Sequence, residues 1–238
     1  MIRKLLKVLG VSVLGLTSLL ANADAARDLE AKLGKIQSLE ANFSQRVIDE
    51  LGNELDYSKG SFQLQRPMKF RWIVSEPYEQ EIVSDGANLW QFDKDIEQIN
   101  VSTLADSFDN SPAALLSKSQ VDMEKDYIVA SLVDSAANDK NSDDSLEQTY
   151  IFHLRPKSEE ALFELMIMEF KGDEFVAFKV KDNLGQTTLV EFSEQQYNQE
   201  FSQGVFQFKP PAGIDLIDSR EQLLDSDLTR PPELSVNG

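Results

Sequence analysis

The sequence predicts a mainly β (α+β) protein in which roughly a dozen antiparallel strands curl into a barrel or a strongly bent sheet. Three observations support this fold class. Segments of alternating apolar and polar residues fill most of the chain, short turns join them, and only two short segments show helical periodicity. Short turns can join antiparallel strands, whereas parallel strands need long crossover connections. Because strand twist accumulates across neighbouring strands, so large a sheet is expected to bend.

The first 23 residues have the three parts of a secretory signal. Arg3 and Lys4 are basic, an apolar stretch runs from Val8 to Leu20, and Ala21-Asn22-Ala23 provides a cleavage site. The apolar stretch is shorter than the about 20 residues that a membrane-spanning helix needs, so it predicts export and not anchoring. We therefore expect residues 1–23 to be removed and the mature chain to be soluble in the periplasm.

The mature chain is expected to begin with a short amphipathic helix from Ala25 to Leu39, because Leu29, Leu33 and Ile36 recur at helical spacing. A change to period two then predicts strands. The turn dipeptide Asp85-Gly86, between two alternating segments, marks the clearest hairpin. The predicted strands cover residues 41–47, 60–65, 70–74, 80–84, 87–92, 96–101, 127–133, 149–154, 162–170, 175–180, 187–192 and 205–209.

A second short helix is predicted at 110–116, where a capping asparagine, a proline suited to the first turn and good helix formers follow one another. Residues 134–147 are acidic and almost free of large apolar side chains, which predicts a solvated loop. The acidic stretch 218–238, with its paired prolines, predicts a flexible tail. The expected organisation is therefore a signal at 1–23, one β-domain at 24–217 and a tail at 218–238.

Acidic residues outnumber basic ones, 41 against 23, for a formal charge of −18. Removal of the signal leaves 20 basic residues and a charge of −21. This balance argues against nucleic-acid binding, which depends on clustered Lys and Arg, and against spontaneous adsorption to anionic lipid. Alternatively, the negative charge serves only to keep the protein soluble. The chain has no cysteine, which excludes disulfides, thiol catalysis, thiolate metal sites and attachment through a lipidated cysteine.

The inventory of catalytic groups is thin, so we predict that the protein is not an enzyme and has no catalytic residue, metal site or cofactor. His153 is the single histidine and lies within a predicted strand, where a surface or packed position is expected. Clustered carboxylates such as Asp143-Asp144 fall in solvated segments, where a rigid acid/base pair is not expected. A pair of carboxylates across a cleft, as in glycosidases, stays open as an alternative.

Large apolar side chains recur on one face of the predicted strands, in a chain with 14 Phe and 2 Trp. They suit either a packed core or an interior that holds an apolar ligand, as closed barrels of eight or more strands can. Arg66 stands out from this background, because it precedes a proline at a strand end. It is either an exposed turn residue or a latch whose donors hold the terminal carbonyls of the short helices.

Several segments resemble those of a known family in their order along the chain. They are Leu39-Glu-Ala-Asn-Phe-Ser-Gln45, Arg66-Pro-Met-Lys-Phe-Arg-Trp72, Ile82-Val-Ser-Asp-Gly-Ala-Asn-Leu-Trp90 with Glu97-Gln98, Ser111-Pro112 with Leu115-Leu116, and Phe206-Gln-Phe-Lys-Pro-Pro211. From about Asp24 to Ile217, the chain therefore resembles the LolA family of periplasmic lipoprotein carriers. Residues 134–147 and the tail depart from the family pattern. The resemblance implies an unclosed antiparallel barrel of about 11 strands under a lid of short helices, with acyl chains in a hydrophobic cavity.

The resemblance also implies roles for individual residues. Arg66 is similar in position to the family arginine that bonds to lid carbonyls and governs closing. Phe70 falls near the mouth, at a position that the family uses in productive transfer. The implied lid residues are Leu29, Leu33, Leu115 and Leu116, and the implied residues of the acyl-binding cavity or its mouth are Phe43, Phe62, Leu64, Phe70, Trp72, Trp90 and Phe92.

The partners that the resemblance implies are acylated lipoproteins, the inner-membrane ABC transporter LolCDE as donor and the outer-membrane receptor LolB as acceptor. LolB shares the fold but is itself a lipoprotein, so the missing cysteine favours the carrier. A monomer without stable membrane insertion is expected. The competing interpretation is a sensor of the same barrel shape, similar to the RseB-like periplasmic regulators, which usually carry an additional domain.

Overall fold

The computed structural model describes residues 17–104, 112–118, 122–134 and 148–220. Its helices in these ranges include α1 (Thr17–Gly34), α3 (Pro112–Ser117) and α4 (Met123–Asp126). Its strands are β1 (Ser38–Ile48), β2 (Glu54–Gln65), β3 (Lys69–Glu76), β4 (Gln80–Asp85), β5 (Asn88–Asp93), β6 (Gln98–Thr103), β7 (Tyr127–Asp134), β8 (Thr149–Pro156), β9 (Phe163–Lys171), β10 (Glu174–Asp182), β11 (Thr187–Tyr197) and β12 (Asp215–Asp218).

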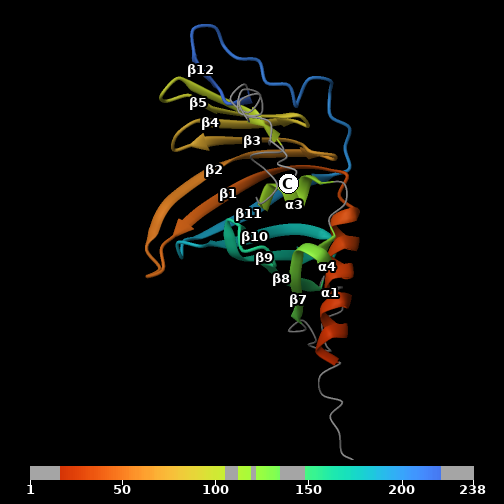
Figure 1. Ribbon diagram of the computed structural model, residues 1–238. Helices are drawn as coiled ribbons and strands as arrows, with labels where there is room; N and C mark the ends of the chain where they lie inside the picture. Colours follow the sequence, from red (N-terminus) through yellow and green to blue (C-terminus); the bar gives the residue numbers. More distant parts are fainter. Residues whose placement is uncertain (1–16, 105–111, 119–121, 135–147, 221–238) are drawn as a thin grey trace, which may run out of the picture.

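These strands form a single 12-stranded sheet in the order β12-β6-β5-β4-β3-β2-β1-β11-β10-β9-β8-β7. Successive strands of the chain are antiparallel neighbours along most of this order, as their short turns predict. Figure 1 shows a strongly bent sheet whose edge strands, β12 and β7, lie far apart, so the barrel is unclosed. The predicted fold class, a mainly β protein with an unclosed curved sheet and few short helices, is confirmed.

Near the end of the chain, one predicted strand is absent and one strand that forms is not predicted. Residues 205–209 do not form a strand. The Phe208 ring stacks on Trp90 of β5, and the buried Phe206 ring packs against Phe201. The sequence analysis also misses β12, which pairs with β6 in parallel, so the sheet is not purely antiparallel. Figure 1 shows the long connection from β11 that allows this parallel pairing.

The helices differ from their predicted ranges. α1 starts within the predicted signal and ends at Gly34, so that Leu39 lies on β1, paired with Leu64. α4, which the sequence analysis misses, begins after Asp122, whose carboxylate accepts a hydrogen bond from the Lys125 amide at 2.9 Å. The predicted loop at 134–147 lies outside the described residues apart from its first residue, and the predicted tail lies outside them beyond residue 220. Across the described residues, no helix is long and apolar enough to cross a membrane.

The concave face of the sheet and the helices share one apolar core. Side chains of β1–β3 and of β7–β11 contribute to it, and Leu29 of α1, Leu115 of α3 and Met123 of α4 are almost completely buried in it. Figure 1 shows the helices over the concave side of the sheet. They therefore cover the face on which a ligand-binding site is expected.

Candidate functional site

Five of the seven predicted cavity residues lie together on the concave face. Phe43, Phe62, Leu64 and Phe70 are almost fully buried, and Trp72 packs against this core while partly buried. The strand register pairs Phe62 with Trp72 and Leu64 with Phe70. The rings of Phe43 and Trp72 stack with their centroids 3.8 Å apart. Because side chains alternate along each strand, these five point to one face and form a continuous apolar surface.

Trp90 and Phe92 lie on the opposite face, which corrects their predicted place in the cavity. Leu89 belongs to the concave core. Side chains alternate along β5, so Trp90 and Phe92 point to the convex side. There the rings of Trp90 and Phe208 stack with centroids 5.4 Å apart, and Phe208 also meets the ring of Phe92. The Arg220 guanidinium lies 5.4 Å from the Trp90 ring centroid. Alternation separates the two faces of a strand, but it does not tell which of them is concave.

The second half of the concave face comes from β8 to β11, which the site prediction omits. Phe62 of the first half meets Phe192 of the second, with ring centroids 5.6 Å apart. The signal in the sequence is the alternation of Met166, Met168 and Phe170, which marks an apolar face of a strand. The residues that this half adds to the core are Phe152, Leu154, Phe163, Met166, Met168, Phe170, Phe175, Phe178, Val180, Val190 and Phe192.

All four predicted lid residues lie on the helices, and their side chains are buried. Leu29 and Leu33 lie on α1, and Leu115 and Leu116 lie on α3. They belong to the same apolar core as the concave face of the sheet. An apolar ligand can therefore enter this space only if some of these side chains leave it.

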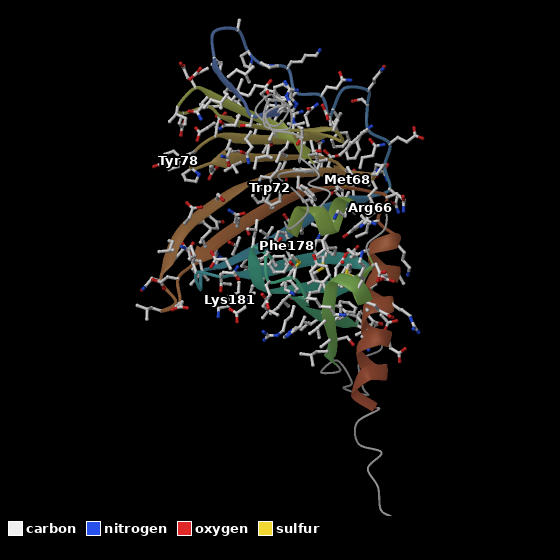
Figure 2. All side chains as sticks on the ribbon, in the orientation of Figure 1. Arg66, Met68, Trp72, Tyr78, Phe178 and Lys181 are labelled. Carbon is white, nitrogen blue, oxygen red and sulfur yellow. The ribbon has the colours of Figure 1, made fainter. Side chains whose placement is uncertain are left out.

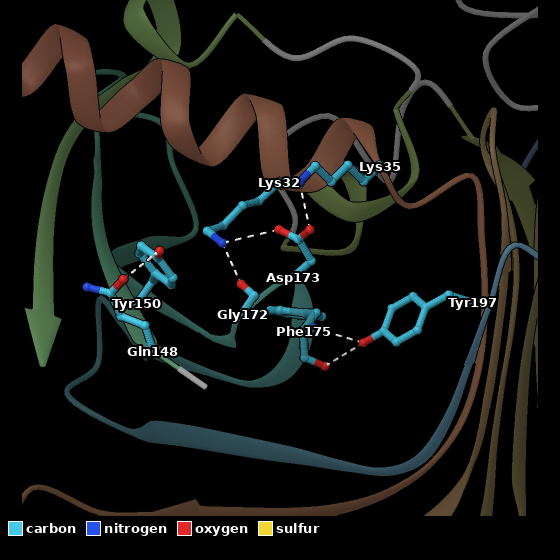
Figure 3. A network of polar contacts seen from close by, with 8 residues as sticks. All are labelled: Lys32, Lys35, Gln148, Tyr150, Gly172, Asp173, Phe175 and Tyr197. Carbon is cyan, nitrogen blue, oxygen red and sulfur yellow. Dashed lines mark hydrogen bonds and ion pairs between the residues drawn. The ribbon is translucent and has the colours of Figure 1, made fainter. Parts of the chain in front are cut away.

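The end of α1 is fastened to the turn between β9 and β10, as Figure 3 shows. Lys35 Nζ lies 2.6 Å from a carboxylate oxygen of Asp173, and Lys32 Nζ donates a hydrogen bond to the Gly172 carbonyl. The same Lys32 ammonium lies 3.8 Å from the centroid of the Tyr150 ring, where it gains a cation–π contact. The hydrogen bond from Lys35 lowers the pKa of the Asp173 carboxyl. These contacts hold α1 against the sheet.

The end of β11 holds the same helix from the other side. Asn198 Oδ1 accepts a hydrogen bond from the Gln37 amide at 2.8 Å, and its Nδ2 donates to the Lys35 carbonyl at 3.1 Å. Beside it, the Tyr197 hydroxyl accepts a hydrogen bond from the Phe175 amide at 2.8 Å, also visible in Figure 3. Burial raises the pKa of Tyr197 to about 12, so the phenol stays neutral at physiological pH. α1 is thus joined to two neighbouring parts of the sheet.

Replacement of Lys32 is expected to weaken the fold more than replacement of Lys35. The Lys32 ammonium is mostly buried, and Lys32→Met loses its hydrogen bond and its aromatic contact, at a cost of about 2 kcal/mol in the free energy of unfolding. Lys35→Met loses only an exposed ion pair, for less than about 0.5 kcal/mol. Urea unfolding of the two variants measures the difference. Equal midpoints would contradict this assignment.

Arg66 lies at the end of β2 and reaches α3. Its Nε donates a hydrogen bond to the Leu116 carbonyl at 3.0 Å. The Met68 amide donates to the next carbonyl, that of Ser117, at 2.8 Å, and the Arg66 amide donates to the Gln37 carbonyl at 2.9 Å. Carbonyls in the last turn of a helix have no partner within the helix, so the Arg66 side chain and the Met68 amide satisfy those of Leu116 and Ser117. Burial lowers the pKa of the Arg66 guanidinium, which nevertheless remains charged at neutral pH.

The histidine lies away from this interior. His153 is partly exposed on β8, and its neighbours in sequence, Phe152 and Leu154, take the buried concave face. In the part of the chain that the structure describes, no three His, Asp or Glu side chains are arranged to hold a metal ion. The described site therefore consists of apolar surface, helix contacts and one arginine.

The bent sheet, its apolar concave face and the helices over that face define a class of half-barrel proteins with a helical lid. The family model of the outer membrane lipoprotein carrier protein LolA matches residues 34–209, and the chain belongs to this family. The family consists of carriers and not of enzymes.

Named relatives and a solved structure are similar to the chain. The outer-membrane lipoprotein carrier protein of Hahella chejuensis is 34% identical over 214 residues, which cover 90% of this chain and 98% of that protein. The one of Alcanivorax borkumensis is 32% identical over 219 residues, which cover 92% and 100%. The crystal structure of the LolA superfamily protein NE2245 from Nitrosomonas europaea has a TM-score of 0.42 and 15% identity, covering 77% of this chain and 98% of that chain. The family assignment rests on the sequence matches.

Proposed function

We propose that the mature chain is a periplasmic carrier that accepts lipoproteins from the inner membrane, shields their acyl chains and delivers them to the outer membrane. One observation carries this proposal: a continuous apolar concave face lies beneath a helical lid, in a chain of the LolA family. The relatives described above are named outer-membrane lipoprotein carriers. A periplasmic location agrees with the secretory signal that residues 1–23 predict.

The acyl chains of the cargo set the physical demand on such a carrier. Each buried methylene contributes about 0.8 kcal/mol, so exposing one chain of about 15 methylenes to water costs on the order of 12 kcal/mol. Spontaneous crossing of the periplasm would therefore be very slow. A carrier that matched this whole amount by tight packing could not release its cargo. We expect loose contacts with the acyl chains and lid contacts that compete with them.

The two lid helices are expected to behave differently. α1 is fastened at its end by Lys32, Lys35 and Asn198, which reach two parts of the sheet. The six-residue α3 receives hydrogen bonds from Arg66 and from the Met68 amide near its last turn. We propose that α3 moves when acyl chains enter while α1 stays in place, and that Arg66 is the latch that favours the closed, empty state.

The proposed partners are LolCDE as donor and LolB as acceptor, as the resemblance implies. In this scheme, ATP hydrolysis by the transporter opens and loads the carrier. Closure of α3 on Arg66 then favours release to the receptor. The loaded protein is open and the empty protein closes, so release of cargo is favoured by closing. Loading reverses this preference, and the transporter supplies the energy for it.

The proposal is tested by incubating the mature protein with inner-membrane vesicles that contain lipoprotein and the transporter. We expect ATP to bring lipoprotein into the soluble fraction in complex with the protein. Vesicles without ATP and vesicles without the protein are the controls. No ATP-dependent release would contradict the carrier function, and a hydrolysed product would indicate an enzyme instead.

A further inference from the structure

A row of hairpin turns forms the end of the half-barrel that lies away from the lid latch. The strand register places the turns after β1, β3, β5, β8 and β10 at the same end of the sheet. We name this end the hairpin rim and define it as residues 49–55, 76–80, 93–97, 157–162 and 182–186. Figure 2 shows Tyr78 of the rim on the opposite side of the molecule from Arg66.

Each hairpin of the rim exposes a large apolar side chain. The exposed fractions are 88% for Leu51, 71% for Tyr78, 65% for Ile96, 65% for Leu162 and 81% for Leu184. Of the 11 large hydrophobic residues that are exposed in the described part of the chain, 6 belong to the rim. Single exposed apolar residues need no explanation, but a group of them on neighbouring hairpins at one end of a protein is a candidate interaction surface.

The hairpins of the rim touch one another and form a single surface. The side chain of Glu50 packs over Gly185, where an added Cβ would lie 2.0 Å from its carboxylate oxygen. Asn183 Nδ2 donates a hydrogen bond to the Ala161 carbonyl at 2.8 Å. Beside Tyr78, a pocket of about 180 Å³ joins the β3–β4 hairpin to side chains of β1 and β2. The exposed apolar residues are therefore held on a connected framework.

The rim is also strongly acidic. Its residues include 11 acids and only 2 lysines. Lys94 forms an ion pair with Glu79 on the neighbouring hairpin, and the Lys94 amide donates to the Glu79 carbonyl at 3.1 Å. Lys157 Nζ donates to the Glu124 carbonyl at 2.6 Å. The two lysines of the rim cannot balance its 11 acids, so the surface has a net negative charge.

We propose that the hairpin rim docks onto a basic protein surface whose pockets receive the exposed apolar side chains. Charge complementarity selects this occupant, because basic groups facing the rim speed association and exclude other partners. A second copy of the chain would bring two acidic rims together, and an anionic bilayer would repel the rim. Docking at this end leaves the Arg66 end accessible, so a membrane protein could hold the carrier without blocking the passage of cargo.

Cosedimentation with envelope vesicles tests the docking surface. The mature protein, free of cargo and without ATP, is incubated with vesicles from the cells that produce it, with protease-stripped vesicles, and with protein-free liposomes of phosphatidylethanolamine and phosphatidylglycerol. We expect binding to intact vesicles alone. The triple variant Leu51→Ser, Tyr78→Ser, Leu184→Ser should bind at least tenfold more weakly. Glu54→Gln, Asp95→Asn, Glu160→Gln together should weaken binding severalfold and reduce its dependence on salt.

The control removes three other exposed apolar side chains, which lie outside the rim and are 46–56% exposed, in the triple variant Ile128→Ser, Leu132→Ser, Leu216→Ser. It should bind as the unchanged protein does, and urea midpoints should show that every variant is folded. A photo-crosslinker at position 51 should capture a protein through a segment rich in Lys and Arg. The proposal is overturned by equal losses in both apolar variants, by binding that survives protease or appears on liposomes, or by no binding at micromolar concentration. Because cargo is absent, these failures would leave the carrier function untouched.

Discussion

Alanine at position 60 is expected to lower the free energy of unfolding by about 3 kcal/mol or more, although it adds only one methyl group. Gly60 lies on β2 where the pairing with β3 shifts its register. A Cβ there would lie 1.7 Å from the Ile73 carbonyl oxygen and 2.9 Å from a ring carbon of Phe43. A backbone oxygen cannot turn aside as a flexible side chain can. The two strands would have to separate, and hydrogen bonds between them would be lost.

Urea unfolding followed by circular dichroism measures the effect of Gly60→Ala as a shift of the midpoint at constant slope. Gly34→Ala is the matched control, because no atom lies within 4 Å of the Cβ that it would add at the end of α1. The control is expected to change the free energy of unfolding by less than about 0.5 kcal/mol. Equal midpoints for Gly60→Ala and the unchanged protein would mean that β2 and β3 adjust to the extra methyl group without loss.

The role of Gly60 illustrates what periodicity can and cannot predict. Alternation located most strands of the sheet, because one buried face imposes period two along each strand. It says nothing of the register shift that brings the Ile73 carbonyl over Gly60. It also fails at β12, where four residues are too few to establish a period and the pairing depends on a long connection across the sheet. Residues 205–209 show the reverse error, since packing on a sheet produces the same alternation as pairing within it.

The candidate site shows the same limit. Five of its apolar residues could be predicted, on β1, β2 and β3, and the resemblance to the LolA family pointed to Arg66, whose Nε contacts the Leu116 carbonyl. The face on which Trp90 lies could not be predicted, because it depends on which side of the whole sheet is concave. The contact of Lys32 with Gly172 joins residues 140 positions apart, and no local pattern encodes such a pairing.

The substitution Arg66→Leu is expected to leave loading intact and to lower transfer to the proposed receptor LolB at least about tenfold. A hydrogen bond from a charged donor contributes about 1.5–3 kcal/mol, and every 1.4 kcal/mol is a factor of ten in an equilibrium constant. Loss of the bond from Arg66 Nε to the Leu116 carbonyl is therefore expected to move α3 toward the proposed open state. An open lid no longer competes with the acyl chains, so the protein retains its cargo.

Transfer of labelled lipoprotein from the loaded variants to vesicles that contain LolB measures this effect. Arg66→Lys keeps the charge without the planar fork of donors. Its transfer should lie between that of the unchanged protein and that of Arg66→Leu. Arg46→Leu removes an exposed arginine of β1 and should transfer normally. Normal transfer by Arg66→Leu would exclude the latch without affecting the carrier function. Because leucine retains much of the apolar contact made by the arginine stem, slower transfer by a variant that keeps a native circular dichroism spectrum and loads normally would assign the defect to the lost hydrogen bond.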